Sequence, residues 1–168
     1  MKRVIIFTTA LLFAFGVANA QKVGYVNSET ILSQIPAFTA AQQELDKLNQ
    51  LYSDLIEEEL TKVEAQFKNY QQLKNQMTPQ QREAKENEII SAEKVIQERQ
   101  KVYFGDEGIM VKKSEELLKP VMDKLQTAID NYAKNNGYMI IIDVASISGI
   151  VYKDPAYDLS AEIIKNLK

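Results

Sequence analysis

The feature that most constrains the fold is the long stretch from residue 37 to residue 135. It is rich in Gln, Glu, Lys and Leu, and its apolar residues recur at steps of three and four. This spacing places the apolar side chains on one side of an α-helix. A helix of that length is far longer than the diameter of a domain built from 168 residues. The sequence therefore predicts a coiled-coil arm as its largest element.

A helix-start signal interrupts this stretch at Thr78-Pro79-Gln80-Gln81. Pro79 has no amide donor and disfavours helical geometry at Thr78, while the Thr78 hydroxyl and the Gln81 side chain can cap a new helix. The pattern favours a reversal of direction, with the arm tip at residues 77–79 exposed and tolerant of insertion. The alternative is a single rod that is kinked at Pro79.

Two apolar series are expected to form the seam between the helices of this hairpin. The first comprises Ala41, Leu45, Leu48, Tyr52, Leu55, Val63, Phe67, Tyr70 and Met77, and the second comprises Leu118, Met122, Leu125, Ile129 and Tyr132. At 1.5 Å per residue the first helix is roughly 60 Å long and the returning helix roughly 85 Å. The returning helix therefore passes the root of the first, and Pro120 is expected to mark its entry into a compact part.

The segment before the arm predicts a short strand and a short helix. Residues 22–26 are a β-prone run, and Asn27 or Ser28 can cap a helix that follows directly. Pro36 must end that helix, because a proline disfavours helical geometry in the residue before it. The amino-terminal end of the mature chain is thus expected to contribute one strand and one helix.

The segment after the arm predicts further short elements. Gly137 stops the long helix, and residues 138–144 have the length and branching of a buried strand. A second short strand is expected at residues 150–152, and Asp158 can cap a terminal helix. Asp143 ends the apolar strand and is interpreted as a cap of the following turn rather than as a catalytic acid.

These elements predict an α+β fold: a long antiparallel helical hairpin on a small β-rich body made from both chain ends. The body comprises residues 21–36 and 121–168, and the arm comprises residues 37–120. So small a body cannot cover its own strand edges and apolar faces, so we expect it to oligomerise. The residues expected at that interface are Val23, Tyr25, Ile140, Ile141, Ile142, Val144, Ile150 and Tyr152.

Residues 1–20 have the pattern of an export signal. Lys2 and Arg3 precede an apolar run over residues 4–17, and Ala18-Asn19-Ala20 forms an A-x-A cleavage site. Cleavage is expected between Ala20 and Gln21, which predicts a periplasmic protein; an uncleaved membrane anchor is the alternative. Loss of two positive charges would change the formal net charge from −3 to −5.

Composition excludes most catalytic chemistry. The chain has no Cys and no His, so thiol nucleophiles, imidazole bases and the usual zinc sites are absent. We expect neither an enzyme nor a cofactor. The acidic charge balance also argues against nucleic acid as a partner, because nucleic-acid binding requires clustered Lys and Arg.

The two chain ends resemble the Skp, or OmpH-like, periplasmic chaperones. The resemblance lies in "KVGYVNSETILSQIP" after the signal peptide and in the ending "YMIIIDVASISGIVYKDPAYDLSAEIIKNLK", with a Gln/Lys/Glu-rich helical hairpin between them. It implies a homotrimer in which three arms enclose a cavity for unfolded outer-membrane proteins, without ATP. A structural spacer or scaffold of the cell envelope is the alternative function.

The charge of this chain departs from that of the better-known members, which are strongly basic with positive arm tips. Here the tip mixes Lys74, Arg82 and Lys85 with glutamates, and the whole chain is acidic. The departure argues against contact with anionic membrane lipid or lipopolysaccharide. Holding of clients depends less on charge, because many weak contacts inside a cavity add up.

The aromatic and methionine side chains of the arm are the candidate client contacts. They are Tyr52, Phe67, Tyr70, Met77, Tyr103, Phe104 and Met110. Each can instead pack in the seam between the helices. Gly105 and Gly108 are expected to form a hinge opposite Leu51 and Leu48, next to a meeting of Tyr52 with Tyr103 and Phe104; alternatively they only allow close packing.

Overall fold

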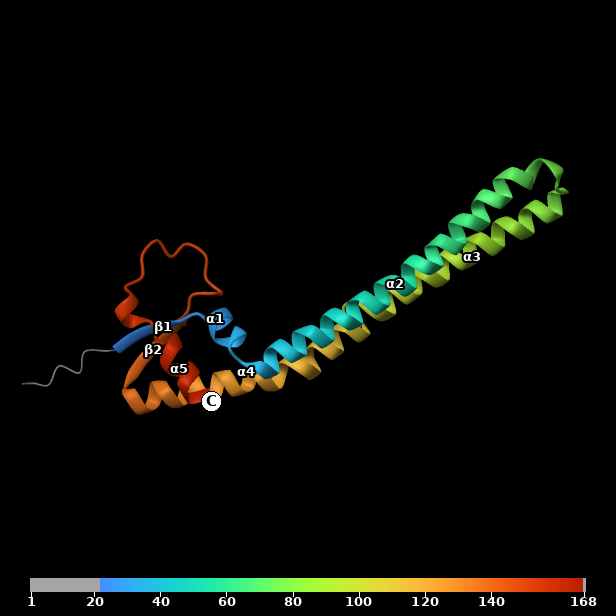
Figure 1. The fold of residues 1–168 in the computed structure, drawn as a ribbon. Coiled ribbons are helices and arrows are strands. Elements are labelled where there is room, and N and C mark those ends of the chain that lie inside the picture. The colour runs from blue at the N-terminus through green and yellow to red at the C-terminus, as the bar shows by residue number, and fades with distance from the viewer. Residues whose placement is uncertain (1–21, 168) are drawn as a thin grey trace, which may run out of the picture.

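The computed structural model describes residues 22–167, so the predicted signal peptide and its cleavage site lie outside the described residues. A small body stands at one end of a long two-helix arm (Figure 1). The elements in chain order are β1 (Lys22–Val26), α1 (Ser28–Ser33), α2 (Pro36–Leu73), the 3-10 turn η1 (Lys74–Gln76), α3 (Pro79–Phe104), α4 (Ile109–Asn136), β2 (Tyr138–Asp143), η2 (Pro155–Tyr157) and α5 (Ser160–Leu167). This is the predicted α+β fold with a helical arm.

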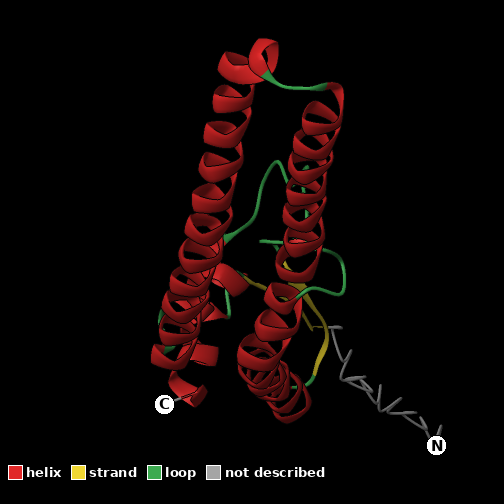
Figure 2. Cartoon of the chain, turned by 90° about the vertical axis from the view of Figure 1, so that its right-hand side faces the viewer, coloured by secondary structure: helices red, strands yellow, loops and turns green. Residues whose placement is uncertain are grey.

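The reversal at the tip follows the local chemistry predicted from the sequence. The Thr78 hydroxyl accepts a hydrogen bond from the Gln81 amide at 3.3 Å, and the Gln81 side chain accepts one from the Thr78 amide at 2.8 Å. Pro79 occupies the first turn of α3, where its missing donor costs nothing. Helices α2 and α3 then run side by side in opposite directions (Figure 2). The kinked-rod alternative is wrong.

The seam of the arm follows the predicted series at Ala41, Leu45, Val63 and Tyr70, which are buried, and departs from it at two positions. The buried residues at its centre are Ile56, Val63 and Tyr70 of α2 with Ile89 and Ile96 of α3. Leu55 and Phe67, both predicted in the seam, are 40% and 48% exposed. Each step of one residue turns a helix by about 100°, so choosing Leu55 instead of Ile56 moves the expected contact to the flank.

Helix α4 connects the arm to the body and runs through Pro120 without ending. Its body half buries Val121, Leu125 and Ala128, whereas Met122 is exposed. The predicted series was correct at Leu125, Ile129 and Tyr132, which pack in or against the body core, and wrong at Met122. The buried side of this half of α4 faces the body rather than continuing the seam. The apolar side of a helix follows whichever neighbour covers it.

The returning helix is interrupted at residues 105–108, where the sequence predicted continuous helix. Gly105 and Gly108 both have extended backbone, with ψ near 171° and 172°. A Cβ atom on Gly105 would lie 2.5 Å from the Lys101 carbonyl oxygen, and one on Gly108 would lie 2.8 Å from the Gly105 carbonyl oxygen. The glycines therefore permit a break whose backbone leaves no room for side chains.

The body joins the two ends of the chain. Strands β1 and β2 are parallel, with Val23 opposite Ile140 and Tyr25 opposite Ile142. Parallel strands require a long crossover connection, and here that connection is the whole arm. The core beneath the sheet consists of Val26, Ile31, Leu32, Val121, Leu125, Ala128, Leu159 and Ile163. Both chain ends and α4 contribute to this core, so none of them can form it alone.

The predicted caps of the body are confirmed. Asn27 caps α1 by accepting a hydrogen bond from the Thr30 amide at 3.0 Å. Gly137 ends α4 in the left-handed region at φ 70°, which a residue with a side chain rarely adopts. Asp158 accepts a hydrogen bond from the Ser160 amide at 2.9 Å at the start of α5. These residues fix where each helix of the body begins or ends.

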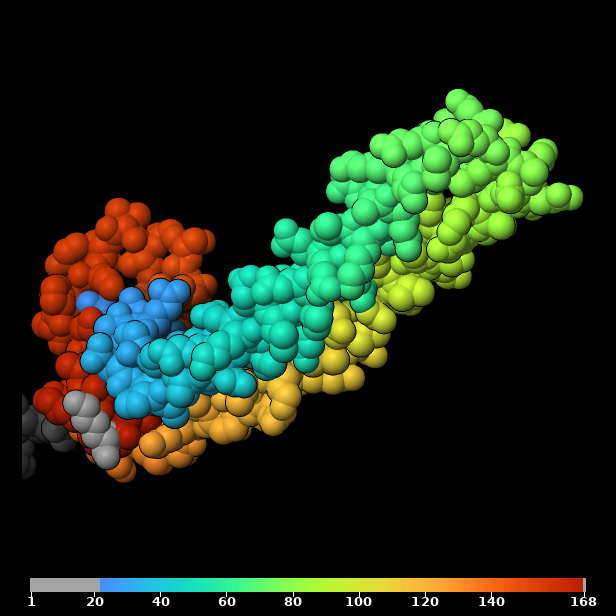
Figure 3. All heavy atoms as spheres, turned by 45° about the vertical axis from the view of Figure 1, so that its right-hand side comes forward, coloured from blue at the N-terminus to red at the C-terminus, as the bar shows by residue number. Residues whose placement is uncertain are grey.

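The strand predicted at residues 150–152 is not formed in the described chain. Val151 and Tyr152 are 99% and 80% exposed, and the connection between β2 and α5 stands out from the body as a loop (Figure 3). A strand requires a neighbour for its backbone donors and acceptors. Among residues 22–167 of this single chain the segment has no neighbouring strand, so it remains irregular.

Candidate functional site

One apolar groove, which we call the body groove, lies between the sheet and the loop that follows it. Its volume is about 410 Å³. Six of the residues predicted at an oligomer interface line it, namely Val23, Tyr25, Ile142, Val144, Ile150 and Tyr152. Ile140 lies on the same sheet face as Ile142, two residues along β2, and is exposed. Ile141 points to the opposite face, against the body core.

Tyr25 places its ring in the body groove, with charged side chains around it. Burial raises the pKa of the Tyr25 hydroxyl, and the nearby carboxylates of Asp158 and Asp154 raise it further. The Lys153 ammonium lies 5.0 Å from the centre of the Tyr25 ring, within the range of a cation–π contact. Tyrosine is uncharged at neutral pH even at its ordinary pKa of about 10, so Tyr25 presents a neutral aromatic ring to the groove.

Asp143 ties the end of β2 to the start of α1. One of its carboxylate oxygens accepts hydrogen bonds from the Ser28 amide at 3.1 Å and from the Ala145 amide at 3.0 Å. Burial acts to raise the pKa of Asp143, but the hydrogen bonds from Ser28 and Ala145 outweigh it and the pKa lies below its usual value. This is the turn-capping role predicted for Asp143. Within residues 22–167, no cluster of three or more acidic side chains is placed to hold a metal ion.

Three of the aromatic candidates meet beside the glycine break, as the hairpin register predicted. The rings of Tyr52 and Tyr103 stack with their centres 4.4 Å apart. Phe104 contacts both rings edge-on, at 6.5 Å from Tyr52 and 6.3 Å from Tyr103. Such contacts are worth about 0.5–1.5 kcal/mol each beyond simple burial. These aromatic contacts thus hold α2 and α3 together immediately on the tip side of the break.

The other four candidates have different surroundings. Tyr70 is buried in the seam and donates its hydroxyl to the Glu86 carboxylate, an interaction that raises the pKa of Tyr70. Met77 packs against the same seam cluster, and Met110 is half-buried at the start of α4. Phe67 is exposed beside the seam. The structure therefore does not bring the seven predicted contact residues together into one surface.

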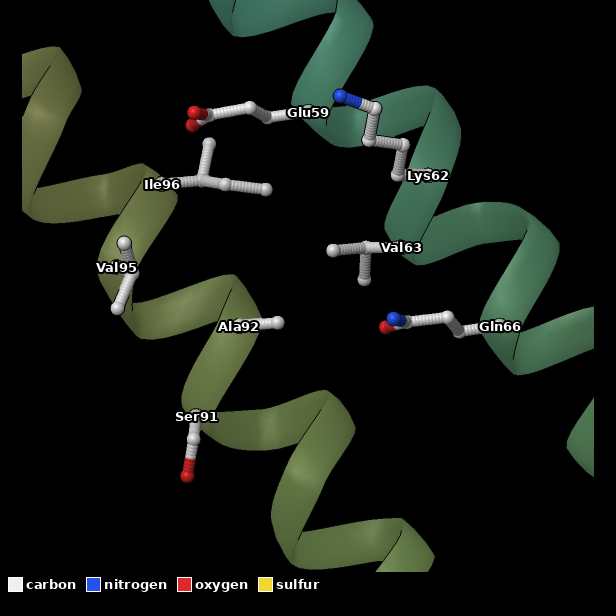
Figure 4. Close-up of a pocket in the computed structure, with 8 residues that line it drawn as sticks. All are labelled: Glu59, Lys62, Val63, Gln66, Ser91, Ala92, Val95 and Ile96. Carbon is white, nitrogen blue, oxygen red and sulfur yellow. The ribbon is translucent and has the colours of Figure 1, made fainter.

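A groove of about 320 Å³ between α2 and α3 escaped the sequence analysis; we call it the arm groove. The residues that line it are Glu59, Lys62, Val63, Gln66, Ser91, Ala92, Val95 and Ile96. Figure 4 shows Val63 and Ala92 facing each other across the gap between the helices. Arg99 of α3 forms an ion pair with Glu59 of α2. The small residue Ala92 was the one sequence signal, because a side chain that ends at Cβ leaves this level of the seam partly empty.

Exposed apolar side chains flank the seam on both sides. Leu60 and Phe104 line a second groove with Ser53 and Glu57, on the side of α2 opposite to Lys62 and Gln66. The exposed apolar residues along α2 and α3 are Leu51, Leu55, Leu60, Phe67, Leu73, Ile90, Val95, Val102 and Phe104. Among residues 22–167, no helix has both the length and the apolar character that a membrane span requires.

Proteins with a known family assignment resemble this chain over nearly its whole length. The family described as outer membrane protein (OmpH-like) matches residues 22–167. Chaperone protein Skp of Photorhabdus luminescens is 22% identical over 162 residues, which cover 96% of this chain and 94% of that protein. Chaperone protein Skp of Yersinia enterocolitica is 20% identical over 157 residues, which cover 94% and 92%.

A solved structure supports the same assignment at the level of the fold. The crystal structure of an OmpH-like outer membrane chaperone from Caulobacter crescentus CB15 superimposes with a TM-score of 0.66 at 14% identity. The match covers 88% of this chain and 83% of that one. Because the family match spans both chain ends and the arm between them, the chain belongs to the outer membrane protein (OmpH-like) family.

Proposed function

We propose that this chain is a periplasmic holdase chaperone that binds unfolded outer-membrane proteins without ATP and prevents their aggregation. Membership of the OmpH-like family supports this function, as do relatives that carry the name chaperone protein Skp. In this proposal the chain is exported, loses residues 1–20, and acts in the periplasm.

The observation that carries the proposal is the set of exposed apolar side chains along the arm. A seam of two helices needs only a narrow apolar stripe, and Ile56, Val63, Ile89 and Ile96 already supply it. The residues on its flanks, such as Phe67 and Val95, therefore do not serve the hairpin. Scattered apolar side chains on a long surface suit weak, repeated contact with an unfolded chain.

The body supplies the assembly step of the proposal, a homotrimer. Its two-stranded sheet is too small to be stable alone in water, and the outer face of the sheet presents Val23 and Ile140. Tyr152 is exposed in the loop that follows the sheet. Contact between copies would cover the body groove and give residues 150–152 a strand neighbour. Three arms rooted in one body would then enclose a space for the client.

The glycine break adds a hinge to the proposal. Residues 105–108 lie between two long helices, and the aromatic contacts of Tyr52 stiffen the arm only on the tipward side. A joint at this level would let the outer arm swing while the root stays fixed, so that one cavity could accept clients of different volume.

The discriminating experiment is suppression of aggregation. An outer-membrane barrel protein unfolded in urea is diluted into buffer with the mature protein, and light scattering is followed with no nucleotide present. We expect scattering to be suppressed at about one trimer per client. Full aggregation in the presence of a folded arm would instead favour the spacer function, because a spacer needs no client surface.

A further inference from the structure

We propose that the arm groove is a docking site for a tyrosine or tryptophan side chain of the unfolded client. The inference rests on the proposed holdase function and names the client chemistry that one place on the arm selects. The floor of the groove is apolar, formed by Val63, Ala92 and Ile96, with Val95 at its edge. At about 320 Å³ the groove has room for an aromatic ring.

The shape of the groove comes from one small residue in the seam. Ala92 faces Val63 where the neighbouring seam levels carry Ile89 and Ile96 (Figure 4). A side chain that ends at Cβ leaves the two helices in place but does not fill the space between them. Both walls belong to uninterrupted helix, since α2 and α3 are continuous at this level. The groove is therefore held open by rigid elements.

The polar groups at the groove favour an aromatic side chain that carries a hydrogen-bond donor. Glu59 shares its carboxylate with Arg99, and its Oε2 atom accepts no hydrogen bond among the described residues. This oxygen is shielded in the present rotamer, but the Glu59 side chain is 24% exposed, so a rotation of the carboxylate turns the unpaired oxygen toward the groove. A tyrosine hydroxyl or a tryptophan indole N–H can supply the missing donor while its ring covers the apolar floor. An aliphatic side chain would cover the floor and leave the acceptor unpaired.

The proposed clients supply this chemistry repeatedly. Outer-membrane barrels carry girdles of aromatic residues at both edges of their apolar band, and their strands alternate apolar and polar side chains. An extended client strand therefore presents a tyrosine or tryptophan on one face and solvent-compatible residues on the other. Lys62 and Gln66 at the rim of the groove can face that polar side.

The test uses the full mature protein and two soluble strand peptides of roughly ten residues with alternating polarity. One peptide carries tryptophan at its centre, and the other carries leucine there. We expect the unmodified protein to bind the tryptophan peptide roughly fivefold more tightly. Ala92→Leu, which fills the groove, and Val95→Ser, which removes its apolar edge, should both abolish this preference.

Two matched variants serve as controls. Ala65→Leu makes the same change on the exposed side of α2, and Val102→Ser makes the same change at a valine that is 54% exposed, compared with 50% for Val95. Both should keep the preference for the tryptophan peptide. Equal binding of the two peptides by the unmodified protein would overturn the inference, as would an unchanged preference in both groove variants.

The barrel-aggregation assay, run on the same unmodified protein, separates this inference from the proposed function. Protection of the barrel without a tryptophan preference would refute the docking site and keep the holdase. A tryptophan preference that Ala92→Leu removes, without protection of the barrel, would keep the docking site and refute the holdase.

Discussion

The arm and the body are stabilised in different ways. In the arm, side chains of the seam pack against the helix directly opposite, as Tyr52 packs on Tyr103 and Val63 packs on α3. In the body, contacts join the two chain ends: the Leu159 amide donates to the Tyr25 carbonyl at 2.8 Å, and the Asn27 amide donates to the Ser160 hydroxyl at 2.9 Å. A destabilising substitution in the arm should therefore loosen only the neighbouring turns, while one in the body should destabilise all elements of the body together.

Their exposed surfaces also differ. Seven apolar or aromatic residues of the body gather around one groove, whereas the apolar residues of the arm are spread along both sides of a seam. A concentrated apolar face suits a partner of fixed shape, such as a second copy of the chain. A dispersed apolar surface suits a partner without fixed shape. In the proposed function, the body would therefore mediate assembly and the arm would contact the client.

The largest effect is expected from a cavity in the body core. Ile163 is fully buried at the centre of the body, and Ile163→Ala should cost about 2–5 kcal/mol. Amide exchange should accelerate across β1, β2, α1 and α5 together. Ile96→Ala, the same change in the arm seam, should accelerate exchange only in neighbouring turns of α2 and α3. If both variants loosen the whole chain equally, the comparison between body and arm is wrong.

Next in size is loss of assembly. Ile140 is exposed on the sheet face that we assign to the interface, so Ile140→Asp should reduce the mass of the mature protein to that of a monomer at micromolar concentration. Ile90→Asp places the same charge on the arm, at a residue that is 60% exposed, and should leave the mass unchanged. A monomeric unmodified protein would contradict the trimer outright. Ile141 is less informative, because it packs against the core and its replacement would also unfold the body.

A smaller effect is expected at the glycine break. Amides of residues 103–110 should exchange faster than those in the rest of the arm, because residues 105–108 lie outside helix. Replacing Gly105 and Gly108 with Ala would place Cβ atoms against backbone oxygens, so the break must reshape into more regular helix. The double variant should slow exchange there without unfolding the body. Exchange already as slow as elsewhere in the unmodified arm would show that there is no hinge.

The smallest effect concerns pH. Because the folded pKa of Asp143 lies below its usual value, its carboxylate stabilises the body above the unfolded pKa of about 3.9. That stabilisation is lost as pH falls through the folded pKa. Chemical unfolding between pH 5 and about 2 should therefore show a weaker acid dependence in Asp143→Ala than in the unmodified protein. Asp46→Ala, at an exposed arm carboxylate, is the control, and equal acid dependence in all three proteins would refute the assignment.

Local signals predicted the course of the chain well. The Thr78 capping box, the stop at Gly137 and the cap at Asp158 each depend on neighbouring residues, so the sequence displays them directly. Folding the hairpin about Thr78 also placed Tyr103 and Phe104 beside Tyr52. Once the turn is known, helical geometry alone determines which levels of the two helices face each other.

Features that depend on packing were missed. The choice of Ile56 over Leu55 for the seam is set by the rotation of one helix against the other, which periodicity defines only to within about one residue. The strand expected at residues 150–152 has suitable residues but no neighbouring strand in the described part of the chain. The arm groove arises because Ala92 meets Val63, a pairing that no single stretch of sequence contains.

Shortening the arms tests the central claim most directly. Removing residues 56–76 and 80–100 deletes three heptads from each helix, keeps the Met77-Thr78-Pro79 turn, and leaves the body untouched. The shortened mature protein should keep the mass of a trimer and lose its protection of an unfolded outer-membrane barrel in the scattering assay. A shortened trimer that protects the barrel as fully as the intact protein would contradict the assignment of client contact to the arm.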